Sequence, residues 1–144
     1  MIIPPNQDSD PAWLLRNLAQ RVPHTRSVVL LSSDGLPKAC HGLDPDGADQ
    51  LAAMAAPIWS LARTAAQKFD DSDVVRQVVA ELNEATLFVS SAGFGSVLAV
   101  LADRSADPSV LGYEMAQLIK SVRPFLATPA RPVAAAHRDS TSPG

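Results

Sequence analysis

The alternation of apolar and polar positions predicts an α+β domain with a central group of strands. Five runs have the length and composition of strands: 27–31, 36–41, 74–82, 86–89 and 96–101. An alanine-rich helix is predicted between the second and third runs, at 48–66. Asp34-Gly35, Asn83-Glu84 and Gly93-Phe94-Gly95 supply the turns. Loops this short join antiparallel neighbours, because parallel strands need long crossovers.

Two further helices are predicted at the ends of this unit. Asp10-Pro11 and Asp107-Pro108 each place an aspartate at the N-cap and a proline at the first helical position. The middle helix begins either at Asp44-Pro45 or at Asp46. Both outer helices have one apolar face, formed by Leu14, Leu15, Leu18 and Val22 in the first and by Leu111, Met115, Leu118, Val122 and Phe125 in the second. The element order is therefore α-β-β-α-β-β-β-α.

The middle helix has more apolar surface than contact with one sheet requires. We expect a stripe to face the sheet, formed by Leu51, Met54, Ile58, Leu61 and Ala65. A second apolar arc, containing several alanines and Trp59, suits a close contact with another helix. The alternative is that both arcs are buried within the monomer. Pro57 should bend this helix.

Strand composition predicts which strands lie at the edges of the sheet. Residues 27–31 and 96–101 are apolar on both faces and are expected to be central, whereas 74–82 contains polar residues and is expected to be an edge. An open edge next to the wide apolar helix suggests one continuous dimer surface. We assign to it Ala52, Ala55, Trp59, Ala62, Arg63, Ala66, Val74, Arg76 and Val78.

Composition narrows the class of protein. The chain has 144 residues, 47% of them hydrophobic, and a net charge of −3, which suits one globular domain without a nucleic-acid footprint. A single cysteine and the absence of a signal peptide or a long apolar run predict a cytoplasmic protein that does not insert into membranes. We expect residues 9–127 to form the domain, and residues 1–8 and 128–144 to be disordered.

No pattern in the sequence indicates catalysis, a metal or a cofactor. Cys40 and His41 are adjacent in a predicted strand, so their side chains point to opposite faces. The Gly93-Phe94-Gly95 turn has neither the lysine nor the following helix of a phosphate-binding loop. Phe94 is the unusual member of this turn. Its ring either folds back onto the domain or anchors a partner.

Several short segments in a fixed order resemble the roadblock, or dynein-light-chain, family in its bacterial form. The resemblance covers about 11–125. It rests on Trp13-Leu-Leu15, Val22-Pro23, Val28-Val-Leu-Leu-Ser-Ser-Asp-Gly-Leu36, Asp49-Gln-Leu-Ala-Ala-Met54, Ser60-Leu-Ala-Arg63, Val75-Arg-Gln-Val-Val79, Leu87-Phe-Val89, Leu98-Ala-Val-Leu101 and Tyr113-Glu-Met-Ala116. This chain departs from the usual bacterial pattern at Pro57 and Phe94.

The resemblance implies a profilin-like arrangement, in which a five-stranded antiparallel sheet lies between one helix and a pair of helices. It also implies a homodimer through the middle helix and the strand that follows it. Family members are non-catalytic partners of small Ras-like GTPases, and bacterial ones often accompany a sensor-kinase-like protein. We therefore expect an adaptor that regulates a small GTPase, recruited to a membrane only through a partner. The alternative is a small-ligand-sensing or scaffold domain in a sensor-kinase complex.

Overall fold

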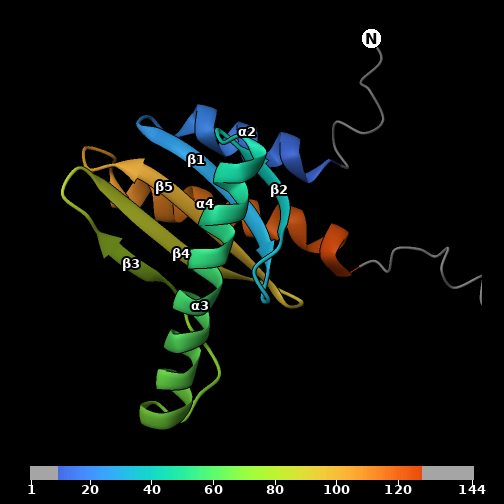
Figure 1. Cartoon of the computed structure of the whole chain (residues 1–144), viewed down its shortest axis with the longest axis vertical. Helices are drawn as coiled ribbons and strands as arrows, with labels where there is room; N and C mark the ends of the chain where they lie inside the picture. Colours follow the sequence, from blue (N-terminus) through green and yellow to red (C-terminus); the bar gives the residue numbers. More distant parts are fainter. Residues whose placement is uncertain (1–9, 128–144) are drawn as a thin grey trace, which may run out of the picture.

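A computed structural model describes residues 10–127 as one sheet with helices on both faces (Figure 1). The expectations for residues 1–8 and 128–144 lie outside this range. The elements are α2 (Pro11–Arg21), β1 (Thr25–Ser32), β2 (Pro37–His41), α3 (Pro45–Phe69), β3 (Val78–Glu81), β4 (Ala85–Gly93), β5 (Ser96–Asp103) and α4 (Pro108–Ala127). Their order confirms the predicted α-β-β-α-β-β-β-α arrangement.

The five strands form an antiparallel sheet in the order β2-β1-β5-β4-β3. The runs that are apolar on both faces, β1 and β5, lie at its centre as expected. β3 lies at one edge, which confirms the edge assignment. The strands β1 and β5 are neighbours although about 70 residues separate them, and their register pairs Ser32 with Ser96.

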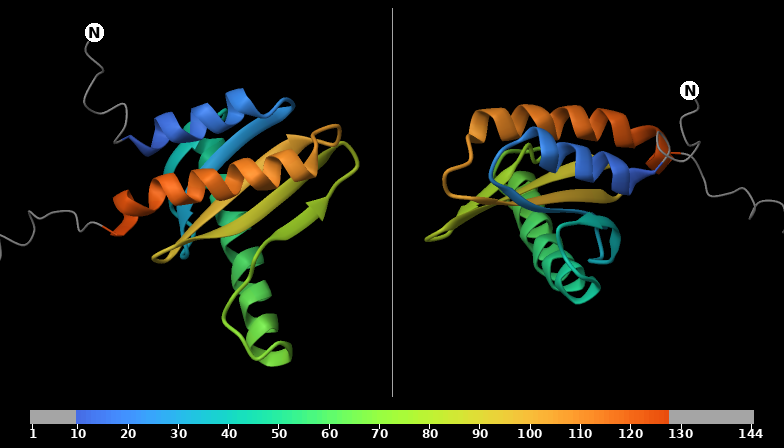
Figure 2. Two further views of the ribbon diagram at one scale, coloured as in Figure 1. Left: turned by 180° about the vertical axis from the view of Figure 1, so that it is seen from behind. Right: turned by 90° about the horizontal axis from the view of Figure 1, so that it is seen from above.

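Helices cover the two faces unequally (Figure 2). α2 and α4 lie on one face, where they pack against side chains that include Val28, Leu30, Phe88 and Val100. α3 lies on the opposite face and packs against Val29, Leu31, Val89 and other strand residues. The face assignment follows from the pleat, because successive residues of a strand point to opposite sides.

The aspartate caps predicted from the sequence are present at all three helix starts. Asp10 Oδ1 accepts from the Ala12 amide at 3.0 Å, and Asp107 Oδ1 accepts from the Ser109 amide at 2.9 Å. For the middle helix, Asp44 Oδ1 accepts from the Gly47 amide at 2.8 Å. This contact selects Asp44 over Asp46 as the N-cap, because the carboxylate satisfies an amide that has no partner within the helix.

Two element boundaries differ from the sequence prediction. α3 extends three residues further at each end than 48–66, whereas the edge strand contains only 78–81 of the expected 74–82. Residues 70–77 instead return along the end of α3, where the Ser72 amide donates to the Ala66 carbonyl at 3.2 Å. The Val74 amide donates to Ser72 Oγ at 2.9 Å. These local hydrogen bonds replace the ladder that an extended strand would form with β4.

A candidate interaction surface on α3 and β3

The C-terminal half of α3 projects beyond the sheet as an arm (Figure 1). The helix crosses the sheet obliquely, and the return segment 70–77 leads from the end of the arm into β3. The arm and β3 therefore lie on one side of the molecule, away from α2 and β2. A helix of 25 residues is longer than the sheet beneath it can cover, so its last turns have no core to pack against.

The side of α3 that packs on the sheet consists largely of alanines. Ala52 and Ala55 are completely buried, and Ala48, Leu51 and Ala56 are buried beside them. Of the stripe expected to face the sheet, Leu51 and Ile58 do pack against it. The expectation is wrong for Met54, Leu61 and Ala65, which are all exposed. Alanines allow the helix backbone to approach the strands closely. Both arcs have helical spacing, so periodicity alone did not decide between them.

This orientation of α3 leaves large apolar side chains in solvent. Met54 is 55% exposed, Leu61 73% and Phe69 82%. Together with Ala65 they occupy positions i, i+7, i+11 and i+15, and we call these four residues the α3 stripe. Val74, on the return segment, is 67% exposed. Apolar residues gathered on a projecting element are typical of a surface that a partner covers.

The edge strand β3 adds unpaired backbone groups to the same side of the molecule. β3 pairs only with β4 among the described strands, so its outer edge is free. Val79 and Leu82 are 47% and 57% exposed. A free edge with apolar side chains favours pairing with another strand.

The residues assigned to a dimer surface fall into three groups. Ala52 and Ala55 have no exposed area, because they pack on the sheet within the monomer, and we remove them from the surface. Four others are half-buried: Trp59, Ala62, Ala66 and Val78. Three are exposed: Arg63, Val74 and Arg76. Sequence reasoning missed Met54, Leu61 and Phe69 as surface residues, because it assigned the first two to the core.

Phe94 does not fold back into the core. It occupies the first position of a two-residue turn between β4 and β5, with φ of 55°, followed by Gly95 with φ of 73°. Positive φ at both positions matches the twist of a hairpin. For a bulky side chain this conformation costs about 1–2 kcal/mol. The side chain nevertheless stays 63% exposed.

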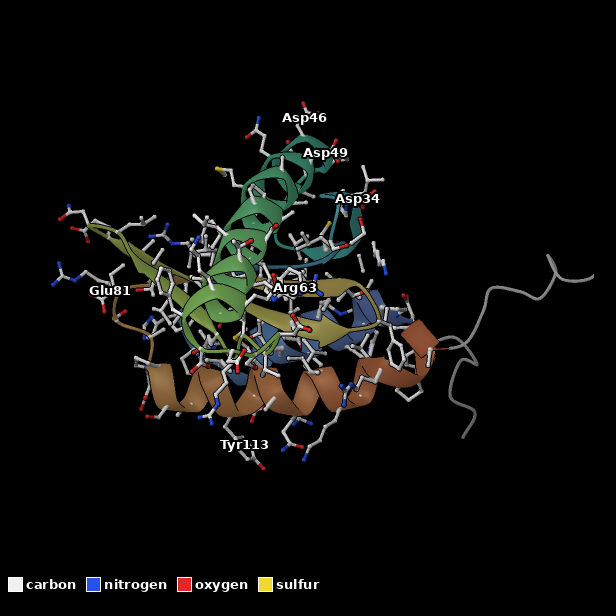
Figure 3. The ribbon with its side chains drawn as sticks, turned by 90° about the horizontal axis from the view of Figure 1, so that it is seen from below. Asp34, Asp46, Asp49, Arg63, Glu81 and Tyr113 are labelled. Carbon is white, nitrogen blue, oxygen red and sulfur yellow. The ribbon has the colours of Figure 1, made fainter. Side chains whose placement is uncertain are left out.

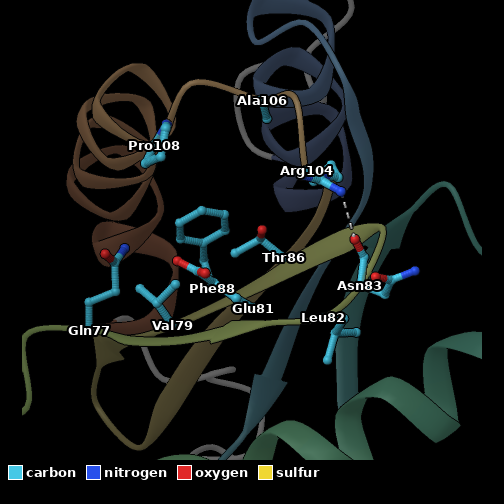
Figure 4. A pocket seen from close by; sticks show the side chains of 10 residues that line it. All are labelled: Gln77, Val79, Glu81, Leu82, Asn83, Thr86, Phe88, Arg104, Ala106 and Pro108. Carbon is cyan, nitrogen blue, oxygen red and sulfur yellow. Dashed lines mark hydrogen bonds between the residues drawn. The ribbon is translucent and has the colours of Figure 1, made fainter.

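A hollow with a volume of about 510 Å³ lies beside β3, on the α4 face (Figure 4). Val79, Leu82, Phe88 and Pro108 supply its apolar lining. Its arginine, Arg104, is engaged by donating from Nη1 to the Asn83 carbonyl at 3.4 Å. The hollow borders the free edge of β3, but it opens on the face of the sheet opposite α3.

Within residues 10–127 no three His, Cys, Asp or Glu side chains lie close enough to hold a metal ion. His137 lies outside this range. Over the same range no helix combines the length and hydropathy that a membrane span requires.

Comparisons with known proteins identify the fold and the family. The Roadblock/LC7 domain family model matches residues 11–102. A solved Roadblock/LC7 domain from Streptomyces avermitilis is 62% identical, with a TM-score of 0.80 over 81% of this chain and 98% of that one. A second domain from this organism is 32% identical, with a TM-score of 0.63 over 77% and 96% of the two chains.

The structure of MglB from Myxococcus xanthus is 12% identical, with a TM-score of 0.74 over 91% of this chain and 100% of that one. At this identity the likeness concerns the fold. No match was found among curated proteins. The family model covers well over half of the chain, and the 62% identical domain is covered almost completely. The chain belongs to the Roadblock/LC7 domain family.

Proposed function

We propose that this protein is a non-catalytic homodimeric adaptor that binds a small Ras-like GTPase and biases its nucleotide state. The observation that carries the proposal is the combination of the exposed α3 stripe with the free edge of β3. A monomer would leave Leu61 73% and Phe69 82% exposed. A second copy that packs its own α3 and β3 against them would bury both.

The dimer surface consists of the α3 stripe, the exposed members Arg63, Val74 and Arg76, and the half-buried residues Trp59, Ala62, Ala66 and Val78. Pairing of the two β3 strands would continue the sheet from one protomer into the other. The two features reinforce each other: the helices supply apolar area, and strand pairing sets the register. A solved MglB is described with a tetrameric arrangement, and its likeness in fold to this chain supports the proposed self-association.

The GTPase half of the proposal rests on membership of the family. An adaptor of this kind acts by preferring one nucleotide state of its partner, and it shifts the equilibrium only by its difference in affinity between the two states. A tenfold preference corresponds to about 1.4 kcal/mol. Exposed apolar residues on regular elements are available for such a contact, and the adaptor itself needs no catalytic group.

Two measurements on the full chain test the proposal. Sedimentation velocity at micromolar concentration should give the mass of a dimer. Calorimetry with purified bacterial Ras-like GTPases, each loaded with GDP or with a non-hydrolysable GTP analogue, should detect binding that differs between the two nucleotide states. A monomer at high concentration would refute the homodimer, and absence of binding in either state would refute the GTPase role.

A further inference from the structure

The turns of the β1–β2 and β4–β5 hairpins lie side by side at one end of the sheet (Figures 1 and 2). They are joined directly, because the Ser33 amide donates to the Gly95 carbonyl at 2.8 Å. Lys38 Nζ also donates to Ser96 Oγ at 2.5 Å, across the β1 strand. The two turns therefore form one connected surface, and we call residues 33–36 together with 93–95 the turn apex.

Each turn of the apex presents one large apolar side chain to solvent. Leu36 and Phe94 are both 63% exposed. Neither turn requires these residues: the first depends on Gly35, with φ of 94°, and a glycine or asparagine would suit the position of Phe94 better. Phe94 is held at a positive φ although most of its side chain lies in solvent. Such strain is typical of functional positions.

Positive charge flanks the apolar pair. Lys38 is exposed, and the guanidinium of Arg123 lies against Gly93, where an added Cβ would be 3.2 Å from Nε. Arg123 comes from the C-terminal part of α4, so a third element contributes to the surface. The acidic residue of the turn, Asp34, is hydrogen bonded to Ser32 Oγ. A complementary surface would offer an apolar pocket with an acidic rim.

We infer that the turn apex is a second protein-docking surface, on which Phe94 and Leu36 enter an apolar pocket with an acidic rim on the small GTPase. The inference rests on the proposed function and adds the place of contact. The apex is built from two hairpin turns with Arg123 of α4 beside them, and it shares no residue with the dimer surface on α3 and β3. A dimer can therefore present two apices, one on each protomer.

The test compares four versions of the full chain for binding to the GTPases named above: the natural sequence, Phe94→Asn, Leu36→Asn and Tyr113→Ala. Tyr113 is the matched control, because it is 62% exposed and projects from the outer face of α4 (Figure 3). Phe94→Asn should weaken binding at least about tenfold, as loss of an interface aromatic does. Leu36→Asn should weaken binding in the same direction, and Tyr113→Ala should bind normally.

Melting temperature and sedimentation separate docking from folding. Asparagine tolerates positive φ, so Phe94→Asn should melt at the same or a higher temperature and remain a dimer. A lower melting temperature would show that the ring packs on its own domain and would overturn the inference. Equal binding by all four versions would overturn the docking site and leave the GTPase role intact. No binding by the natural sequence would refute both.

Discussion

The guanidinium of Arg63 lies over the indole ring of Trp59, 5.6 Å from its centroid. The two residues are one helical turn apart on α3, and Trp59 also packs against the cluster between α3 and the sheet. Trp59 Nε1 is buried without a hydrogen-bond partner among the described residues. Trp59 thus belongs partly to the core of the monomer, and Arg63 is engaged with it. A charge at Trp59 would disturb folding as well as association.

Leu61 is the better position for testing self-association, because it is 73% exposed and contributes little to the core. Leu61→Glu should convert the dimer to a monomer, since a carboxylate would be buried in the interface without a partner. Sedimentation velocity measures the mass, and the melting temperature of the dissociated chain reports folding. Tyr113→Glu is the control and should remain dimeric. If the Leu61→Glu variant dimerised with unchanged affinity, the interface would lie elsewhere.

The buried alanine face of α3 should resist enlargement. Ala55→Leu inserts three carbons where the side chain is fully buried against the sheet, and it should lower the free energy of unfolding by about 1–3 kcal/mol. Ala116→Leu, at an exposed position of α4, should change it by less than about 0.5 kcal/mol. Urea denaturation measures both. Equal effects would mean that α3 does not sit tightly on the sheet.

Two glycines should respond in opposite directions to the same substitution. Gly42 has φ of 87°, and an added Cβ would lie 2.3 Å from the Arg26 carbonyl oxygen, so Gly42→Ala should cost at least about 2 kcal/mol. Gly112 lies within α4, and an added Cβ there would meet nothing within 4 Å. Gly112→Ala should stabilise the protein by about 0.5–1 kcal/mol. Thermal unfolding of the two variants measures both effects. A Gly42→Ala variant as stable as the natural sequence would contradict the backbone geometry at Gly42.

The purified chain should not bind GTP by itself. The Gly93-Phe94-Gly95 segment is a hairpin turn that leads into β5, and it offers no helix N-terminus to a phosphate. Calorimetric titration of GTP and Mg²⁺ into the protein should give only heats of dilution. Saturable binding would assign a nucleotide site to this chain and would remove the basis for a purely adaptor role.

The sequence by itself determined the order of the elements, the aspartate caps of the two outer helices and the identity of the central strands. These features depend on local chemistry: a carboxylate next to an orphan amide, a glycine at a turn, or an apolar run long enough for a buried strand. The apolar faces of α2 and α4 were also predictable, because each helix has only one. Leu15 and Met115 are buried as their spacing required.

Only the tertiary structure decided which side of α3 meets the sheet and how much of it remains exposed. Ala55 and Leu61 lie on two apolar arcs of one helix, and neither helical spacing nor hydrophobicity decides which arc is buried. The choice depends on the distance at which α3 can approach β1, β5 and β4, which favours the small side chains. The length of the sheet then decides which part of α3 packs in the core and which part projects beyond the sheet as the arm. The exposure of Leu61, Phe69 and Phe94 depends on which elements lie close to them in the folded protein. The spacing of residues along the chain carries no information about those distances.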